Sequence, residues 1–281
     1  MGKTKAWAPF PFEAKGFDHA GAKLEKAWGK LHTGDLEPFP DEAQVAACIK
    51  AAKLSLDAGE AAESLQEAWR AFHRGDFQQA YELGTALGPL GASVAVKAGG
   101  IHATHLVDKD AAKLERYQAL VDLAEAATQA LPKLANSHYR RAFAIGRYSQ
   151  GISIAKALAQ GLAGKVKESL DATLKLAPKH AEAHSALGLY HAEIIHKVGS
   201  MIGGLTYGAK AATGEKHLAT AVELTPDSPI AHIEYGNGLL LLFGDKREDD
   251  AAAAYERAAK LKPRDAMEKL DAEYAASQIE D

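Results

Sequence analysis

The sequence of 281 residues predicts an all-α fold. Helix-forming residues dominate it, prolines fall at regular breaks, and no segment has the sustained two-residue alternation of a half-buried strand. A short pattern also occurs three times: a proline, a histidine six residues later, and a small residue four positions further on. His138, His184 and His232 hold the histidine position. Because such self-similarity is typical of repeat proteins, we expect successive helix hairpins stacked into one continuous body.

The breaks between apolar segments place the expected helices in pairs along the chain. The expected ranges are 18–32 with 41–57, 60–74 with 76–88, 91–106 with 109–131, 135–149 with 152–176, 181–197 with 210–225, and 229–243 with 248–261, followed by a last helix from 265.

Local chemistry supports several of the predicted helix starts. Asp76 with Gln79, and Asp265 with Glu268, have the spacing of a capping box, in which each side chain satisfies an orphan backbone amide. Ser228 precedes a proline, whose missing amide costs nothing in the first turn. We therefore expect helices to begin next to Asp76, Ser228 and Asp265.

Two segments resemble the two halves of a tetratricopeptide repeat. Residues 181–191, Ala-Glu-Ala-His-Ser-Ala-Leu-Gly-Leu-Tyr-His, match the Leu-Gly of its first helix, with histidines at the two aromatic positions. Residues 251–263 carry its alanine, aromatic, alanine and proline, and residues 75–80 resemble its inner turn. The resemblance covers residues 60–270 and is weak over residues 1–59.

This resemblance implies a right-handed superhelical array of about six antiparallel hairpins. Residues 60–264 would form the array, residues 1–59 an N-terminal extension with a divergent hairpin, and residues 265–281 a capping helix and tail. The intervals between Pro132, Pro178 and Pro226 exceed the repeat length of about 34 residues, so the extra residues either lie between the two helices of a pair or lengthen both helices together.

Two of these insertions, residues 150–164 and 194–208, are apolar yet rich in glycine. Glycine permits close backbone approach, so one interpretation is long helix ends with a close-packed loop. The other is a mobile apolar flap over a binding groove, with Met201 and Tyr207 as contact residues.

Composition excludes several classes of function. The formal net charge of -4 and the pI near 6.3 provide no basic footprint, so we expect no nucleic-acid partner. No apolar run is long enough to cross a bilayer, which predicts no membrane insertion. No apolar run follows the early lysines either, so we expect a cytoplasmic protein, or a periplasmic one if a signal has been removed. The single cysteine, Cys48, is expected to be a small buried hydrophobe.

Twelve histidines raise the question of a metal site. The three repeated histidines do not share an ion, because packed helices lie roughly 8–10 Å apart and a zinc ligand lies near 2 Å from the metal. We expect them to pack between helices and to donate to a carbonyl or a carboxylate. No metal, cofactor or catalytic residue is predicted. The nearest catalytic motif, Gly-Ile-Ser-Ile-Ala at 151–155, lacks its last glycine and its preceding strand.

One stripe of side chains is a candidate binding surface. In the proteins that this chain resembles, the equivalent stripe lines a concave groove that holds a partner segment. Its predicted members are Leu65, Trp69, Phe72, His73, Tyr139, Arg140, Phe143, Arg147, Leu189, Glu193, Ile233 and Asn237. The competing interpretation is that the aromatic members fill the core of a closed helical array.

The sequence therefore predicts a non-enzymatic interaction module or scaffold that holds a peptide or partner helix in its groove. Neither the partner nor the oligomeric state follows from the sequence. An alternative is a small-molecule-binding repeat protein of the transporter-associated type, whose glycine-rich insertions close an apolar cavity. A third hypothesis, an enzyme, would require a water-accessible polar cluster at His184, His191 and Glu193.

Overall fold

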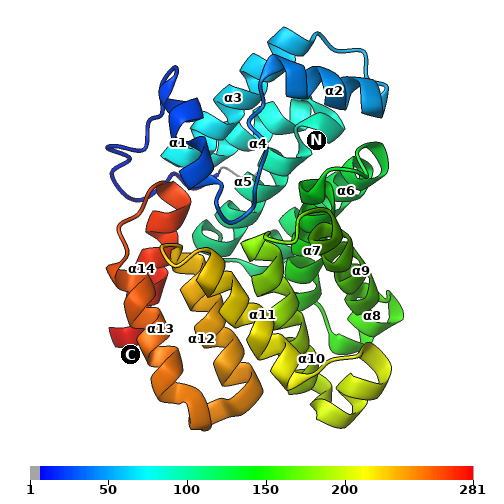
Figure 1. Ribbon diagram of the computed structural model, residues 1–281, viewed down its shortest axis with the longest axis vertical. Helices are drawn as coiled ribbons and strands as arrows, with labels where there is room; N and C mark the ends of the chain where they lie inside the picture. Colours follow the sequence, from blue (N-terminus) through cyan, green and yellow to red (C-terminus); the bar gives the residue numbers. More distant parts are fainter. Residues whose placement is uncertain (1–6, 281) are drawn as a thin grey trace. The chain divides into compact units, whose positions relative to one another are not determined.

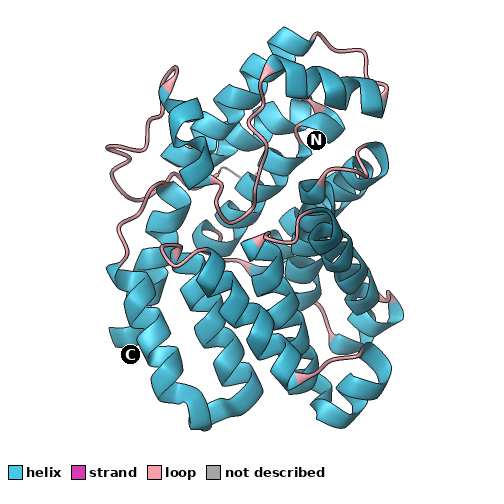
Figure 2. Ribbon diagram, in the orientation of Figure 1, coloured by secondary structure: helices cyan, strands magenta, loops and turns pink. Residues whose placement is uncertain are grey.

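The structure, a computed structural model, describes residues 7–280. Its helices follow one another along the chain and pack mainly against their neighbours in sequence (Figure 1). Helices and loops account for all of the described residues, which include no β-strand (Figure 2). The predicted all-α class, built from antiparallel helix hairpins, is confirmed.

The contacts between residues divide the chain into two compact units, a division that the repeat pattern gives no sign of. Unit 1 contains residues 1–28, 38–156 and 265–267, and unit 2 contains residues 29–37, 157–264 and 268–281. Each unit therefore includes one piece from the N-terminal region and one from the C-terminal region in addition to its main segment.

The main segment of unit 1 is a run of helices in which each packs on the next, and α5 also packs on α3 and α7. This pattern is the one expected of stacked hairpins. In chain order these helices are α2 (Glu42–Ala52), α3 (Ala58–Arg74), α4 (Phe77–Ala86), the short 3-10 helix η1 (Gly88–Leu90), α5 (Ala92–Leu106), α6 (Asp110–Ala130) and α7 (Ala135–Gln150). Cys48 of α2 is buried, as the sequence predicts.

Unit 2 repeats this arrangement. Its helix α10 packs on α9, α11 and α12, and α12 packs on α13. Its elements are α9 (Leu162–Leu176), α10 (Ala181–Tyr207), α11 (Ala211–Leu224), α12 (Pro229–Phe243), the 3-10 helix η2 (Gly244–Arg247) and α13 (Glu248–Lys260). Three helices are divided between the units: α1 (Lys23–Leu31), α8 (Ile154–Ala159) and α14 (Ala266–Glu280).

The predicted helix starts are found, with different hydrogen bonds in two cases. The Asp76 carboxylate accepts from the backbone N–H of Gln79 at 3.3 Å, as a cap does. Helix α12 begins directly after Ser228, whose side chain makes no capping hydrogen bond. Glu268 accepts from the backbone N–H of Arg264 at 2.7 Å, one residue before the N–H of Asp265 that a capping box would use.

Glycine accounts for two departures from the predicted helix bounds. The single helix expected over 152–176 is interrupted at Gly161, whose φ of 62° lies in the left-handed region. The helix expected to end at residue 197 continues to Tyr207, across a kink at Gly199 with φ 81° and ψ 159°. Both residues adopt backbone conformations that side chains with a Cβ disfavour.

Glycines also set the closest helix contacts in unit 2. A Cβ built on Gly188 of α10 would lie 2.5 Å from Cγ of Leu218, and one built on Gly238 of α12 would lie 2.2 Å from Cδ1 of the same leucine. Leu218 of α11 is therefore held between the glycine faces of two neighbouring helices, where no larger side chain fits.

Candidate functional site

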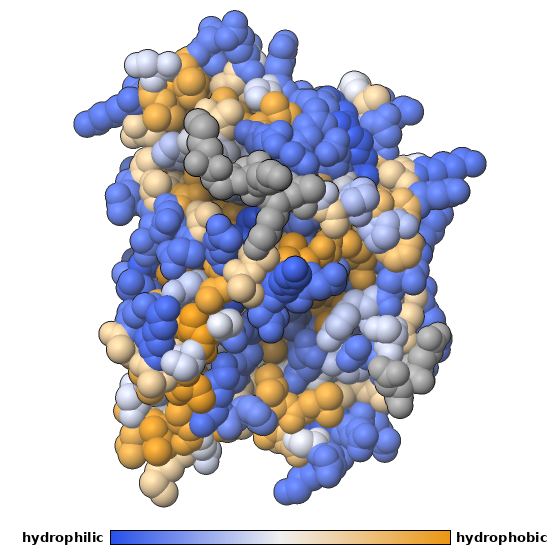
Figure 3. Space-filling view, turned by 180° about the vertical axis from the view of Figure 1, so that it is seen from behind, coloured by the Kyte–Doolittle hydropathy of each residue, from blue (hydrophilic) through white to orange (hydrophobic). Residues whose placement is uncertain are grey.

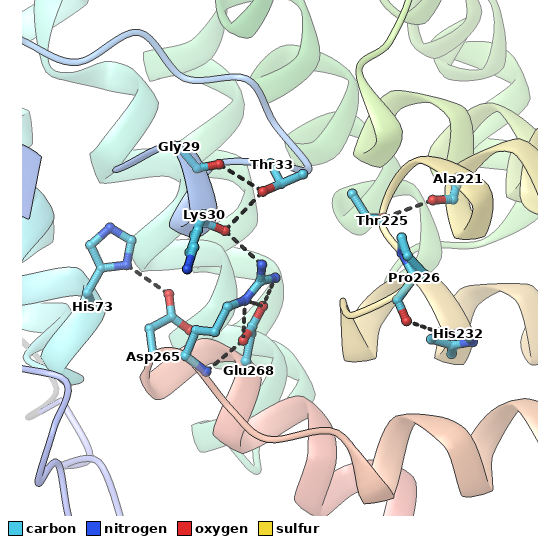
Figure 4. A network of polar contacts seen from close by, with 11 residues as sticks. Gly29, Lys30, Thr33, His73, Ala221, Thr225, Pro226, His232, Asp265 and Glu268 are labelled. Carbon is cyan, nitrogen blue, oxygen red and sulfur yellow. Dashed lines mark hydrogen bonds and ion pairs between the residues drawn. The ribbon is translucent and has the colours of Figure 1, made fainter. Parts of the chain in front are cut away.

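The three repeated histidines make the same hydrogen bond. The Nε2 atoms of His138, His184 and His232 lie 2.8, 3.0 and 2.8 Å from the carbonyl oxygens of the prolines six residues earlier. Figure 4 shows the third pair, in which His232 points at Pro226. A carbonyl only accepts, so Nε2 carries the proton in each case. The prediction that these histidines donate to a carbonyl or carboxylate is confirmed.

The hydrogen bond to the proline carbonyl determines which ring nitrogens donate and accept in a histidine cluster of unit 2. Because Nε2 of His184 donates to Pro178, the Nδ1 atom of the neutral ring is an acceptor. It lies 2.8 Å from Nδ1 of His217, which is therefore the donor. The His191 ring stacks on His217 with centroids 6.4 Å apart, and its Nδ1 accepts from the backbone N–H of Lys210. The three rings form one hydrogen-bonded and stacked group.

Burial favours the uncharged form of His217 and His191. It lowers the pKa of His217 from 6.5 to about 4, and the neighbouring His184 and His191 add to the decrease. The pKa of His191 is also lowered, first by burial and then by Lys167. Glu193, the third residue of the enzyme hypothesis, forms an ion pair with Lys197. The rings are largely enclosed and bond to one another and to the backbone, which is the character of packing rather than of a reactive centre.

The structure buries the four predicted groove residues of α3. Leu65, Trp69, Phe72 and His73 are at most 5% exposed, so in this fold they belong to the core of unit 1. The cause is the N-terminal extension, which lies over this face. Trp28 packs edge-to-face on Trp69 at 5.8 Å between ring centroids, and the carbonyls of His19 and Pro40 accept from Arg70 and Gln66.

Of the predicted groove residues on α7, Phe143 and Arg147 reach the surface in part, whereas Tyr139 and Arg140 are buried. Phe143 lies against α5, where a Cβ on Gly100 would be 2.2 Å from its Cε1 atom. The Arg147 guanidinium lies over the Phe143 ring at 5.7 Å from the centroid, within cation–π range. These two residues form a joined apolar and cationic patch on unit 1.

The predicted groove residues of unit 2 divide in the same way. Ile233 is buried in a cluster with Tyr255, Ala258 and Ala275. Asn237 is half-buried, accepting from the Tyr255 hydroxyl and donating to Glu234 at 3.0 Å. Leu189 and Glu193 on α10 are half-buried.

The residues suggested as a flap lie in the last turns of α10. Met201 is 76% exposed, and its neighbours Ile202 and Leu205 are exposed as well. Orange surface gathers at the lower left of Figure 3, over this end of α10. Tyr207 is half-buried, and its carbonyl accepts from the hydroxyl of Tyr190 at 3.2 Å. The segment forms an apolar tip beyond the Gly199 kink.

The N-terminal segment forms a contact that sequence reasoning missed. Residues 7–12, Trp-Ala-Pro-Phe-Pro-Phe, have no regular secondary structure and lie against α4, α5 and α6. We call them the aromatic segment. Trp7 packs on His102 and Tyr81 with centroids 4.3 and 5.1 Å apart, and the Arg116 guanidinium lies 3.8 Å from its ring centroid. The only sequence signal was the density of aromatic residues and prolines, which no repeat pattern explains.

Phe10 is the second anchor of the aromatic segment. Its ring meets Phe77 at 6.4 Å and Phe12 at 5.6 Å, in both cases edge to face. A Cβ on Gly75 would lie 2.6 Å from Cγ of Phe10, so only glycine leaves room for this ring. Gly75 also ends α3 with φ 93°, so one residue both ends the helix and admits the anchor.

In each unit, polar contacts join residues that are far apart in the sequence. In unit 1, His73 Nδ1 lies 2.8 Å from the Asp265 carboxylate, and Figure 4 shows the two groups facing each other. In unit 2, Arg264 binds Glu268 through its guanidinium and donates to the Lys30 carbonyl at 2.8 Å. The carbonyl of Gly34 accepts from the backbone N–H of Glu182 at 3.0 Å.

The part of the chain that the structure describes has neither a metal-binding cluster nor a membrane-spanning helix. Residues 7–280 contain no group of three or more histidine, cysteine, aspartate or glutamate side chains placed to hold a metal ion. Within the same range, no helix has the length and apolar character needed to span a membrane.

Comparison with known proteins supports the fold. No family model matches the chain, and no significant match is found among curated proteins. The structure resembles TTC0263, a thermophilic TPR protein of Thermus thermophilus, with 15% identity and a TM-score of 0.54 over 77% of this chain and 99% of that one. A MamA RS-1 double mutant aligns with 19% identity and a TM-score of 0.37, over 79% of this chain and 98% of that one. The chain thus has a divergent form of the fold of tetratricopeptide repeat proteins.

Proposed function

We propose that this protein is a non-enzymatic scaffold that binds a protein or peptide partner on its repeat helices. One observation carries the proposal: the helices of unit 1 already hold an irregular stretch of polypeptide, the chain's own N-terminal extension. They do so with rings packed edge to face and with side chains that donate to backbone carbonyls, as in the contacts of Phe10 with Phe77 and of Arg70 with His19. These are the interactions by which repeat surfaces recognise peptides.

The patch of Phe143 and Arg147 is the partner contact in this proposal. An apolar ring beside a guanidinium suits a partner that has an apolar anchor next to an acidic group, because Arg binds carboxylates through two parallel hydrogen bonds. Aromatic and arginine residues are also the types that contribute most to binding energy at protein interfaces.

The test is partner retention by a double variant, Phe143→Ala with Arg147→Glu. The immobilised wild-type protein is expected to retain a partner from native extract, and the variant at least tenfold less, because loss of an anchor and a reversed charge cost about 1.4 kcal/mol or more. Quantitative mass spectrometry of the retained proteins gives the measurement.

The matched control is Arg257→Glu, which reverses an arginine on α13 that is 54% exposed at its side chain. Circular dichroism establishes that both variants keep their helix content, since Phe143 also packs on Gly100. Equal retention by wild type and the double variant would rule out this patch as the partner contact.

A further inference from the structure

The aromatic segment lies on a surface formed by Gly75, Phe77, Tyr81, His102 and Arg116, which we call the seat. We propose that the seat is a peptide-recognition site, which residues 7–12 of the same chain occupy in cis. The ligand class that displaces them is an extended peptide with the same tryptophan, proline and phenylalanine spacing and a carboxylate next to the tryptophan. This inference rests on the proposed function and names the partner chemistry of a second surface of unit 1.

The aromatic segment has the form of a bound peptide ligand. Its rings, Trp7, Phe10 and Phe12, are half-buried, whereas Ala8 and both prolines are exposed. Ring anchors alternating with exposed prolines are typical of extended ligands, in which proline lowers the entropy lost on binding. The binding energy comes from the anchors, and the chain between them acts as a spacer.

The seat is shaped for these anchors by three different helices. Trp7 lies among Tyr81 of α4, His102 of α5 and Arg116 of α6. Phe10 fills the space left by the absent side chain of Gly75 and meets Phe77. The Trp7 ring lies under the Arg116 guanidinium, and three residues later the Phe10 ring occupies the space beside Gly75. A ligand must match the spacing between these two rings.

The seat also contains polar atoms that the aromatic segment leaves unsatisfied. His102 is 2% exposed, and the backbone of Ala8 approaches its ring, but neither ring nitrogen makes a hydrogen bond of standard geometry within the described residues. The Nη1 atom of Arg116 is likewise buried and unpartnered within that part of the chain. Burial and Arg116 lower the pKa of His102 to about 4, although the backbone of Ala8 acts against the decrease. The neutral ring keeps one N–H, so His102 and Arg116 both offer donors to an incoming acceptor.

A carboxylate is the group that completes this site. It accepts from the guanidinium and from the imidazole, and it neutralises a cation that the tryptophan ring contacts only through its π-face. The chain's own sequence ahead of Trp7 is Lys-Thr-Lys-Ala, which contains no acidic group. The cis ligand therefore occupies the seat through its covalent attachment, which gives it a high effective concentration, and not through full chemical complementarity.

The test uses the full chain with Trp7→Ala and Phe10→Ala, which empties the seat. Two fluorescent peptides are compared by anisotropy: residues 5–14 of this chain, and the same peptide with Lys5→Glu and Ala6→Asp. We expect the acidic peptide to bind the emptied chain about tenfold more tightly than the unchanged peptide. The wild-type chain, with its seat occupied, is expected to bind both peptides at least about tenfold more weakly than the emptied chain.

Arg116→Gln, added to the emptied chain, is expected to abolish the preference for the acidic peptide. The proposal is overturned if the emptied chain keeps wild-type helix content yet binds neither peptide, or if the acidic preference survives Arg116→Gln. Concentration-dependent dimers of the wild type that dissociate on removal of the aromatic segment would assign the seat to a second copy instead, and would also overturn it.

A second variant keeps every native anchor, in case the emptied chain does not fold. A protease site inserted at Gly16, an exposed residue with no atom within 4 Å of its Cβ direction, allows cleavage after folding. The acidic peptide should then release the cleaved segment at about tenfold lower concentration than the unchanged peptide. Equal release by both peptides, or none, contradicts the proposal. Because Phe143 and Arg147 are intact in these variants, failure here leaves the partner-retention test unaffected.

Discussion

At the scale of single residues, the recurrent histidine shows how far spacing alone can predict chemistry. A fixed distance of six residues from a proline predicted one repeated structural event, and the structure gives the same Nε2 to carbonyl bond three times. The spacing does not predict the second hydrogen-bond partner of His184. That partner, His217, lies next to His184 because α11 packs on α10.

We predict that His232→Phe lowers the free energy of unfolding by about 1 kcal/mol, the usual net contribution of one such hydrogen bond. The ring volume is retained while the donor to the Pro226 carbonyl is lost. Urea denaturation measures the change. His196→Phe, at an exposed position of α10, serves as control and should change the value by less than about 0.5 kcal/mol. Equal effects of the two substitutions would refute the role of the bond.

The depressed histidine pKa values predict a loss of stability in acid. His217 and His102 have pKa values of about 4 in the fold against 6.5 when unfolded, so between these limits the unfolded chain binds more protons. Stability contributed by the neutral rings is therefore complete above about pH 6.5 and is lost as the pH falls towards 4. His217→Gln, which retains an N–H donor, should reduce this decline by about 1–3 kcal/mol in urea titrations at pH 7.5 and pH 4.5. An unchanged decline would refute the assignment.

At the scale of helices, the bounds followed from the sequence because each end has a local cause. Proline at the start of α12 and aspartate before α4 act within a few residues of themselves. The unexpected break at Gly161 lies within the helix expected over 152–176, whereas the helix expected to end at residue 197 continues across the kink at Gly199. A glycine allows a positive φ, but its presence in the sequence does not show whether the chain adopts one at that position.

The glycine contacts of α10 predict a pair of opposite substitutions. Gly188→Ala would place a Cβ 2.5 Å from Leu218 and 3.0 Å from the carbonyl oxygen of Gly214, so the helices must separate, at a cost of about 1–3 kcal/mol. Gly164→Ala in α9 meets no atom within 4 Å and should stabilise the protein by up to about 1 kcal/mol through helix propensity. Thermal unfolding of both variants gives the comparison, and a neutral Gly188→Ala would argue against close packing at this crossing.

At the scale of the whole molecule, the repeat pattern predicted the fold far better than it predicted the surface. Helical periodicity marks an apolar face on α3 but does not distinguish a groove from a core, because that depends on what covers the face. The covering residues, His19, Trp28 and Pro40, lie where the repeat signal is weak. Phe143 and Arg147 are partly exposed, and the aromatic segment carries none of the repeat's sequence features.

The buried pair of His73 and Asp265 joins residues that are 192 positions apart in the sequence. We therefore expect its loss to lower the stability of unit 1 as a whole. Asp265→Ala is expected to lower the free energy of unfolding by about 2–4 kcal/mol, because a buried imidazole loses its carboxylate. Denaturation followed by tryptophan fluorescence suits this test, since Trp69 stacks on His73 at 5.9 Å. The exposed Asp227→Ala is the control. A loss no larger than that of the control would count against the pair.

The same pair has a consequence for biosynthesis. Unit 1 receives its last residues, 265–267, only after the ribosome has translated all of the main segment of unit 2. Domains generally fold as units during synthesis, from the N-terminus onwards. In the nascent chain, however, His73 lacks Asp265 while the 192 residues up to it are translated, so this contact of the N-terminal helices forms only after the main segment of unit 2 has been synthesised.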